Sequence, residues 1–294
     1  MEIRTLNYFL TVARECNITK AADSLHITQP TLSRQLKQLE DELGTTLFIR
    51  GRRKVSLTDD GLALKRRAEE IVYLAQKIDD EVGNEGNEIA GSITIGVGLT
   101  EATVTMLKYM KEFMELYPRV SFNVRNENSS IVTYSIDTGT MDVGVVIDPI
   151  DIRKYESVHL KKDEVWGVLM RRDSPFAKKK SISVEDLKKM DLITSGRDEV
   201  KMEIRDHFGK DIDEFHFVAA SSLLTTSAMM VENNFGNALV LQGSVKEALT
   251  EKVTCIPLNP PFLTKSHVIY KKYEKPSRQV NAFIEFIRKK ESER

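Results

Sequence analysis

The chain has 294 residues, with 43 basic and 44 acidic side chains and a formal net charge of −1. A hydrophobic fraction of 41% is ordinary for a globular protein and excludes a disordered chain or a collagen-like fibre. Two cysteines cannot build a disulfide framework or a four-thiolate metal site, and we expect no metal and no cofactor. Without a long apolar run or a secretory signal, we expect a cytoplasmic protein that makes no membrane contact.

Charge is distributed unevenly along the chain. Residues 1–67 hold 12 Lys or Arg and 8 Asp or Glu, a net charge of +4, which leaves −5 for the remainder. A basic end suggests a polyanionic partner for that end alone, although a solvated surface would carry the same charges.

The first 44 residues predict three helices. Apolar residues at three- and four-residue steps, from Ile3 to Ala13, predict the first helix. Thr19 is expected to cap a short second helix over residues 20–25, and Thr28 to cap a third helix that ends at Gly44. A short helix, a tight turn and a longer helix form a helix-turn-helix unit.

The start of the third helix is polar and basic, whereas its last turn is acidic. Such a helix can point its start into the DNA major groove, where Arg and Gln read base edges and hydroxyls bind phosphates. A solvated helix face is the alternative. The predicted DNA-binding residues here are Thr28, Gln29, Pro30, Thr31, Ser33, Arg34, Lys37 and Gln38.

A basic hairpin is predicted next. Residues 45–50 and 55–57 read as two short strands joined by a glycine-containing turn, which would form a wing. Four cations lie within five residues and are expected to contact phosphates, so that binding depends strongly on salt. They are Arg50, Arg52, Arg53 and Lys54.

A long helix is predicted from Thr58 to about Val82. Its apolar residues alternate between four- and three-residue steps, a heptad pattern that favours a two-chain coiled coil. A single amphipathic helix packed on its own domain is the alternative. The predicted dimerisation residues are Leu64, Ala68, Ile71, Ala75, Ile78 and Val82.

From residue 91 onward, short apolar runs alternate with helical stretches. This alternation predicts an α/β fold with a mostly parallel sheet. Strands are expected near 92–95, 120–124, 142–147, 165–170, 192–193, 215–219, 238–241, 253–256 and 267–270. Helices are expected near 102–117, 184–190, 199–208, 223–233 and 278–290.

The first 62 residues resemble the LysR-type transcriptional regulators. The resemblance is carried by residues 21–25, 28–33, 39–44, 47–50 and 53–61, which follow the order and spacing of that family's winged helix-turn-helix. Thr28 and Thr31 depart from it, because family members more often have Ser and Ala there. The C-terminal part resembles the family more weakly, for example at residues 95–96, 113–118, 139–143 and 236–240.

This resemblance implies an α/β multidomain protein. It would comprise an N-terminal winged helix-turn-helix over residues 1–60, a linker and dimerisation helix over 58–88, and a two-lobed, periplasmic-binding-protein-like α/β domain over 89–294. Lobe I would take residues 89–163 and 267–294, and lobe II residues 164–266. The family further implies double-stranded DNA as partner, dimers through the linker helix, and a homotetramer.

A small-molecule effector, of unknown identity, is expected between the two lobes. Four loops that precede helices offer hydroxyls and free N–H groups to an anion or polar ligand, although these groups would cap those helices in any case. Glu101 would repel a carboxylate, and Arg197 could compensate from the opposite lobe. The predicted effector-binding residues are Gly98, Thr100, Ser129, Ser130, Thr194, Ser195, Arg197 and Ser221.

The sequence therefore predicts an effector-controlled, DNA-binding transcriptional regulator that is not an enzyme, with RNA polymerase as a further candidate partner. A constitutive regulator without an effector is one alternative. An α/β oxidoreductase with a DNA-binding head is the other, although the Gly96–Gly98 turn lacks the third glycine and the later acid of a dinucleotide-binding loop.

Overall fold

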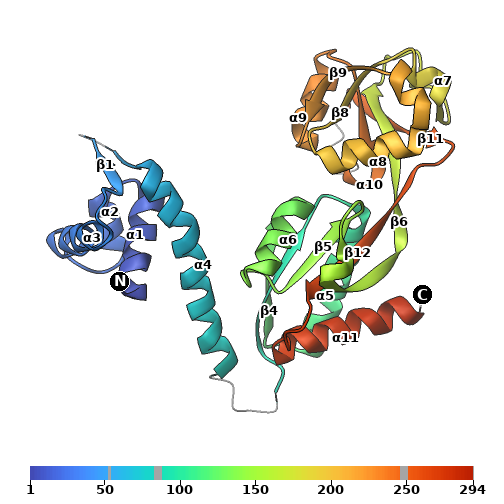
Figure 1. Cartoon of the computed structure of the whole chain (residues 1–294). Helices are drawn as coiled ribbons and strands as arrows, with labels where there is room; N and C mark the ends of the chain where they lie inside the picture. The colour runs from blue at the N-terminus through green and yellow to red at the C-terminus, as the bar shows by residue number, and fades with distance from the viewer. Residues whose placement is uncertain (52–53, 83–87, 246–250, 294) are drawn as a thin grey trace. The chain divides into compact units, whose positions relative to one another are not determined.

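The computed structural model describes residues 1–51, 54–82, 88–245 and 251–293 (Figure 1). It separates into two compact units, one of residues 1–88 with 138–140, and one of residues 89–137 with 141–294. Arg52 and Arg53 lie outside the described residues. No helix in the described part of the chain is both long enough and apolar enough to cross a membrane.

The first unit is a helical head with a small hairpin. Its elements are α1 (Ile3–Glu15), α2 (Ile18–Ser24), α3 (Gln29–Leu43), β1 (Phe48–Arg50), β2 (Val55–Leu57) and α4 (Asp59–Val82). Asn17 caps α2 by accepting a hydrogen bond from the backbone N–H of Lys20, so the prediction that Thr19 is the cap was wrong. Helix α3 ends where predicted, because Gly44 takes the left-handed conformation at φ 68°.

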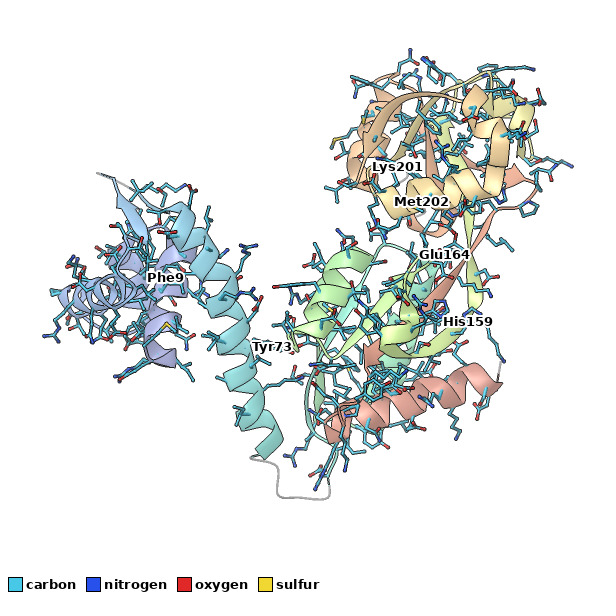
Figure 2. The ribbon with its side chains drawn as sticks, in the orientation of Figure 1. Phe9, Tyr73, His159, Glu164, Lys201 and Met202 are labelled. Atoms are coloured by element: carbon cyan, nitrogen blue, oxygen red, sulfur yellow. The ribbon has the colours of Figure 1, made fainter. Side chains whose placement is uncertain are left out.

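The core of the head draws on every helix of the unit. Apolar side chains of α1, α2 and α3 meet the hairpin, and the rings of Phe9 and Phe48 lie 5.2 Å apart. Phe9, labelled in Figure 2, is fully buried. Ala68 and Val72 of α4 complete this core. The head therefore holds α3 by its buried leucines and leaves the opposite face to solvent.

The second unit contains two α/β lobes that share long strands. Lobe I contains β3 (Gly91–Val97), α5 (Glu101–Leu116), β4 (Val120–Asn126), α6 (Ser129–Asp137), β5 (Val143–Ile147), η1 (Ile152–Lys154) and α11 (Arg278–Glu293). Lobe II contains β7 (Ile182–Ser183), α7 (Val184–Leu187), β8 (Asp191–Ser195), α8 (Asp198–Phe208), η2 (Gly209–Glu214), β9 (His216–Ser221), α9 (Leu224–Glu232), β10 (Asn237–Leu241), α10 (Gln242–Val245) and β11 (Val253–Asn259). Strands β6 (Tyr155–Arg171) and β12 (Leu263–Lys271) pass from one lobe to the other (Figure 1).

The sheet is mixed rather than mostly parallel, which corrects the sequence-based expectation. The strand order is β4-β3-β5-β12-β6-β10-β8-β9, with β11 on β6 and β7. Strands β3, β4 and β5 are parallel in lobe I, and so are β8, β9 and β10 in lobe II. The two strands that cross between the lobes pair antiparallel with their neighbours, β6 with β10 and β12, and β12 with β5.

Each lobe buries both faces of its sheet under helices. In lobe I, α5 and α11 contribute Phe113 and Phe283 to one core, while α6 contributes Val132 and Ile136 to the core on the other face. In lobe II, one core takes side chains from α7 and α8, and the other takes them from α9. Packed helices thus fix the loops at the carboxyl ends of the parallel strands. In open α/β sheets, ligands bind at these ends.

Candidate DNA-reading helix and inter-lobe cleft

Helix α3 presents a polar start on a firmly packed scaffold. Leu32, Leu36 and Leu39 are at most 1% exposed and fix the helix from behind. The opposite side carries exposed Thr28, Gln29, Pro30, Arg34, Lys37 and Gln38, with Thr31 and Ser33 partly exposed. The structure therefore brings the predicted residues of this helix to one accessible side.

Hydrogen bonds organise several of these side chains in the absence of DNA. The hydroxyls of Thr28 and Thr31 lie 2.8 Å apart, and Gln29 donates to the hydroxyl of Ser33 at 2.9 Å. Thr28 occupies the predicted N-cap position of α3, but its side chain makes no cap hydrogen bond to the helix. Its hydroxyl bonds Thr31 instead.

Arg34 differs from its neighbours on α3. Lys37 pairs with Asp41 at 3.1 Å, and Gln38 donates to Glu42 at 3.1 Å. Arg34 is exposed and has no hydrogen bond or ion pair to any described residue. The guanidinium of Arg34 can donate two parallel hydrogen bonds to the edge of a guanine without breaking a bond within the head.

The hairpin is held by main-chain contacts. Ile49 pairs with Ser56 across the two strands, and the turn is closed by the Gly51 N–H, which donates to the carbonyl of Lys54 at 3.0 Å. The Val55 N–H donates to the carbonyl of Cys16, which ties the hairpin to the end of α1. Lys54 is exposed, whereas the side chain of Arg50 lies outside the described residues.

Glu40 is a structural residue that the sequence did not single out. It is 8% exposed, and one carboxylate oxygen accepts hydrogen bonds from the backbone N–H groups of Leu47 and Phe48, at 2.8 and 3.3 Å. The acidic last turn of α3 therefore contains one buried acid, which joins the recognition helix to the hairpin, and two exposed acids.

The heptad pattern of α4 serves two purposes. Ala68 is fully buried in the head core, so the prediction that it faces a partner chain was wrong. Leu64 packs against the same core and is partly exposed, so its contact with a partner chain stays a prediction. Ile71 and Ile78 are 38% and 59% exposed. Ala75 is partly exposed, and the side chain of Val82 lies outside the described residues. An apolar stripe is thus left on the second half of the helix.

The first predicted effector loop is occupied by the protein's own groups. Thr100 caps α5 by accepting from the Thr103 N–H at 3.2 Å, and the Thr103 hydroxyl donates to the carbonyl of Gly98. Glu164, on β6, accepts from the N–H groups of Ala102 at 2.8 Å and Glu101 at 3.3 Å. Burial raises the pKa of Glu164.

The other three loops also use their polar groups locally. Asn128, rather than Ser129 or Ser130, bonds the N–H of Ile131 at the start of α6. Ser195 accepts from the Arg197 N–H, and the hydroxyl of Ser221 donates to the carbonyl of Leu223. Thr194 lines a separate cavity of about 390 Å³ beneath α8. Loop closure therefore accounts for the hydroxyls of Ser195 and Ser221.

A further cavity lies elsewhere in the described chain. It measures about 640 Å³ and is formed by the segment after β5 and by one side of α8. Its lining residues are Pro149, Ile150, Asp151, Ile152, Arg153, Glu199, Met202, Glu203 and Asp206. None of the eight predicted effector residues lines it. Met202 and Glu164 are labelled in Figure 2.

Glu203 is the most perturbed group in this cavity. Burial raises its pKa to about 7, with Asp148 adding to the rise, while a hydrogen bond from Thr264 and the charge of Arg197 oppose it. The Thr264 hydroxyl donates to one carboxylate oxygen at 2.9 Å. The other oxygen, Oε2, is buried and has no partner among the described residues. No group of His, Cys, Asp and Glu in the described chain is arranged to hold a metal ion.

Two family descriptions match this chain over most of its length. "Bacterial regulatory helix-turn-helix protein, lysR family" matches residues 3–62, and "LysR substrate binding domain" matches residues 86–292. These ranges correspond to the helical head and to the two-lobed unit. The fold predicted from the sequence is confirmed.

Individual relatives are transcriptional regulators rather than enzymes. The chain is 37% identical to HTH-type transcriptional regulator BsdA of Bacillus subtilis (strain 168) over 175 residues, which span 59% of either protein. It is 27% identical to HTH-type transcriptional regulator BudR of Raoultella terrigena over 295 residues, which span 98% of this chain and all of BudR. These relatives favour the regulator over the oxidoreductase alternative.

A solved structure shares the fold along the whole chain. The crystal structure of CbnR, a LysR family transcriptional regulator, superposes with a TM-score of 0.77 at 20% identity and covers 99% of both chains. At this identity the similarity establishes the fold alone. Together, the helical head with its wing, the two-lobed α/β unit and the matching family descriptions show that the chain belongs to the LysR family of regulatory helix-turn-helix proteins.

Proposed function

We propose that the protein is a sequence-specific, DNA-binding transcriptional regulator. The observation that carries this proposal is the accessible start of α3, where Gln29, Ser33 and Arg34 lie together on a leucine-anchored helix. Arg and Gln hydrogen-bond purine edges in the major groove, while hydroxyls and the cations of the hairpin bind phosphates. Among solved relatives, full-length CbnR has been crystallised with its target DNA, which supports DNA as the partner.

The regulator acts as a dimer through the second half of α4. Ile71 and Ile78 are one heptad apart and exposed, so two copies of the helix can bury them against each other. Two heads held in this way would read half-sites separated by about one helical turn of DNA or a multiple of it. A tetramer, formed as a dimer of dimers, follows as a proposal from the family.

The two lobes bind a small effector, and effector binding changes how the heads meet DNA and RNA polymerase. The cavity lined by Glu203 is large enough for a small organic molecule, and one buried carboxylate oxygen of Glu203 has no partner among the described residues. A ligand that binds one arrangement of the protein more tightly than another shifts the population between them. A constitutive regulator would need no such cavity.

Footprinting of the full-length protein on its own upstream region tests the proposal. We expect protection of two related half-sites on the same face of the duplex, and its loss in an Ile71→Asp, Ile78→Asp double variant. Sedimentation should show that this variant is monomeric while circular dichroism retains the helical signal. A single protected half-site, or a dimer that survives the double substitution, would contradict the proposed assembly.

A further inference from the structure

The N-terminus of α5 is closed to an anionic ligand. Backbone N–H groups at the start of a helix ordinarily attract anions. Here the carboxylate of Glu164, which is fully buried, already accepts hydrogen bonds from the N–H groups of Glu101 and Ala102. The carboxylate of Glu101 itself pairs with Lys162 at 2.8 Å. A carboxylate effector would have to displace Glu164 from this position. The N-terminus of α5 is therefore not available as a binding site for such an effector.

The neighbouring cavity is acidic. Its lining includes four carboxylates, those of Asp151, Glu199, Glu203 and Asp206, against one cation, Arg153. Arg153 is already engaged, because its guanidinium donates two hydrogen bonds of 2.8 Å to Asp151. The other three carboxylates of the wall, all on α8, therefore have no cation in the cavity wall to pair with. They stand one turn apart, at positions 199, 203 and 206, and so line the same side of the helix.

One buried polar atom of these acids lacks a partner. Oε2 of Glu203 has no hydrogen-bond partner among the described residues. The other oxygen of the same carboxylate accepts a hydrogen bond from the hydroxyl of Thr264. Buried polar atoms are nearly always hydrogen-bonded, so Oε2 indicates that a donor from outside the protein completes the site.

Arg197 is a nearby cation that favours an anion. Its Nε atom is buried without a partner, and its charge lowers the pKa of Glu203. Neither Arg197 nor Asp148 is part of the cavity wall. The charge of Asp148 raises the pKa of Glu203, and its carboxylate lies 3.6 Å from Nε2 of His267. The charge that faces the cavity is therefore negative. Its remaining wall is apolar, from Ile150, Ile152 and Met202.

We propose that the effector of this protein is a small organic cation, an amine or guanidinium carried on an apolar body. The cationic group donates hydrogen bonds to Glu203 and neutralises the carboxylates of α8, while the apolar body packs on Met202 and the two isoleucines. This inference rests on the proposed effector function and specifies the chemical class of the ligand.

Matched sets of probes that differ only in charge test this inference. One set is benzylamine, benzyl alcohol and benzoate, and a second is hexylamine, hexanol and hexanoate. Binding to the full-length protein is measured at pH 8 by isothermal titration and by the shift in thermal midpoint. We expect an amine of at least one set to bind at least tenfold more tightly than its alcohol and its acid.

Variants show whether the binding uses the cavity. Glu203→Gln should weaken the amine at least tenfold, and Asp206→Asn, at an exposed position of the same wall, should weaken it less. Glu185→Gln removes an exposed acid of lobe II outside the cavity and should leave binding unchanged. If Glu203→Gln does not fold, Asp206→Asn remains the comparison.

The outcomes separate this inference from the proposed function. Three results would overturn the cationic class. They are a carboxylate probe that binds more tightly than its amine, the failure of every amine to bind, and an amine whose affinity for the Glu203 and Asp206 variants equals its affinity for the wild type. Operator footprinting of the same preparation is independent of that result. Its failure would contradict the proposed function, whatever the probes do.

Discussion

One carboxylate oxygen of Glu164 lies 2.8 Å from the backbone nitrogen of Ala102, at the start of helix α5. Glu164 comes from β6, 62 residues further along the chain, at the point where this strand passes between the lobes. A buried acid thus ties the crossing strand to the first helix of lobe I. The same contact caps the helix and keeps its N-terminus from binding another anion.

Replacement of Glu164 should destabilise the two-lobed unit. Glu164→Ala leaves the N–H groups of Glu101 and Ala102 unsatisfied, and we expect a loss of about 1–3 kcal/mol in the free energy of unfolding. Glu164→Gln keeps an oxygen that can accept from Ala102, so it should lose less. Urea denaturation followed by tryptophan fluorescence of Trp166 measures both. Equal stability of the alanine variant and the wild type would show that the contact contributes nothing.

Glu203 should make stability depend on pH. Because its pKa is raised from 4.5 to about 7 in the folded protein, the folded state holds a proton that the unfolded state releases between these values. The contribution of this group to stability is present below pH 4.5 and is lost as the pH rises to 7.

Glu203→Gln removes this dependence. The variant should become more stable relative to wild type as the pH rises from 5 to 8, by at most about 3 kcal/mol, since each pKa unit corresponds to about 1.4 kcal/mol. Partial exposure of the side chain makes the smaller values the expected ones. Denaturation curves at four pH values measure the difference. A difference that stays constant with pH would mean that Glu203 titrates normally.

Glu40 should stabilise the head, because its carboxylate is buried between α3 and the hairpin. Glu40→Ala leaves the N–H groups of Leu47 and Phe48 without their acceptor, with an expected cost of about 1–3 kcal/mol. Asp41→Ala is the matched control, because Asp41 is exposed on the next position of the helix. Resistance to proteolysis should show a weakened head for Glu40→Ala alone. Identical behaviour of the two variants would contradict this role.

Cys255 should be unreactive in the folded protein. Burial raises the pKa of its thiol to about 12, so little thiolate forms near neutral pH. At pH 8, a thiol reagent should label Cys255 only when the protein is unfolded. A Cys16→Ser variant, which leaves Cys255 as the only thiol, isolates the measurement. Rapid labelling of the native variant would show that the thiol is activated.

Local sequence patterns predicted the helical head well. Leucine spacing placed α3, and Gly44 marked its end, because both signals act within one helix. Gly61 belongs to the residues that resemble the family, but only the structure explains why a glycine is needed there. A Cβ atom at this position would lie 2.2 Å from the carbonyl oxygen of Leu47. The heptad pattern of α4 could not distinguish Ala68, which faces its own head, from Ile71, which is exposed.

The cleft could not be located from the sequence because its residues meet only through long-range pairing. Glu164 and Thr264 become cross-strand neighbours through the crossing of β6 and β12, about 100 positions apart. The hydroxyl-rich loops carried a clear local signal, but that signal described helix caps. An acid placed immediately before a buried strand was the one available clue to Glu164.

The binding specificity of an Arg34→Ala variant shows whether helix α3 reads base edges. Affinities for the operator and for random duplex are compared at several salt concentrations, with Arg172→Ala as a control for the loss of an exposed cation in lobe II. We predict a loss of about 1–3 kcal/mol on the operator, little change on random DNA, and relaxed preference at one or two base pairs. Equal weakening on both DNAs, or none on either, would contradict base reading by helix α3.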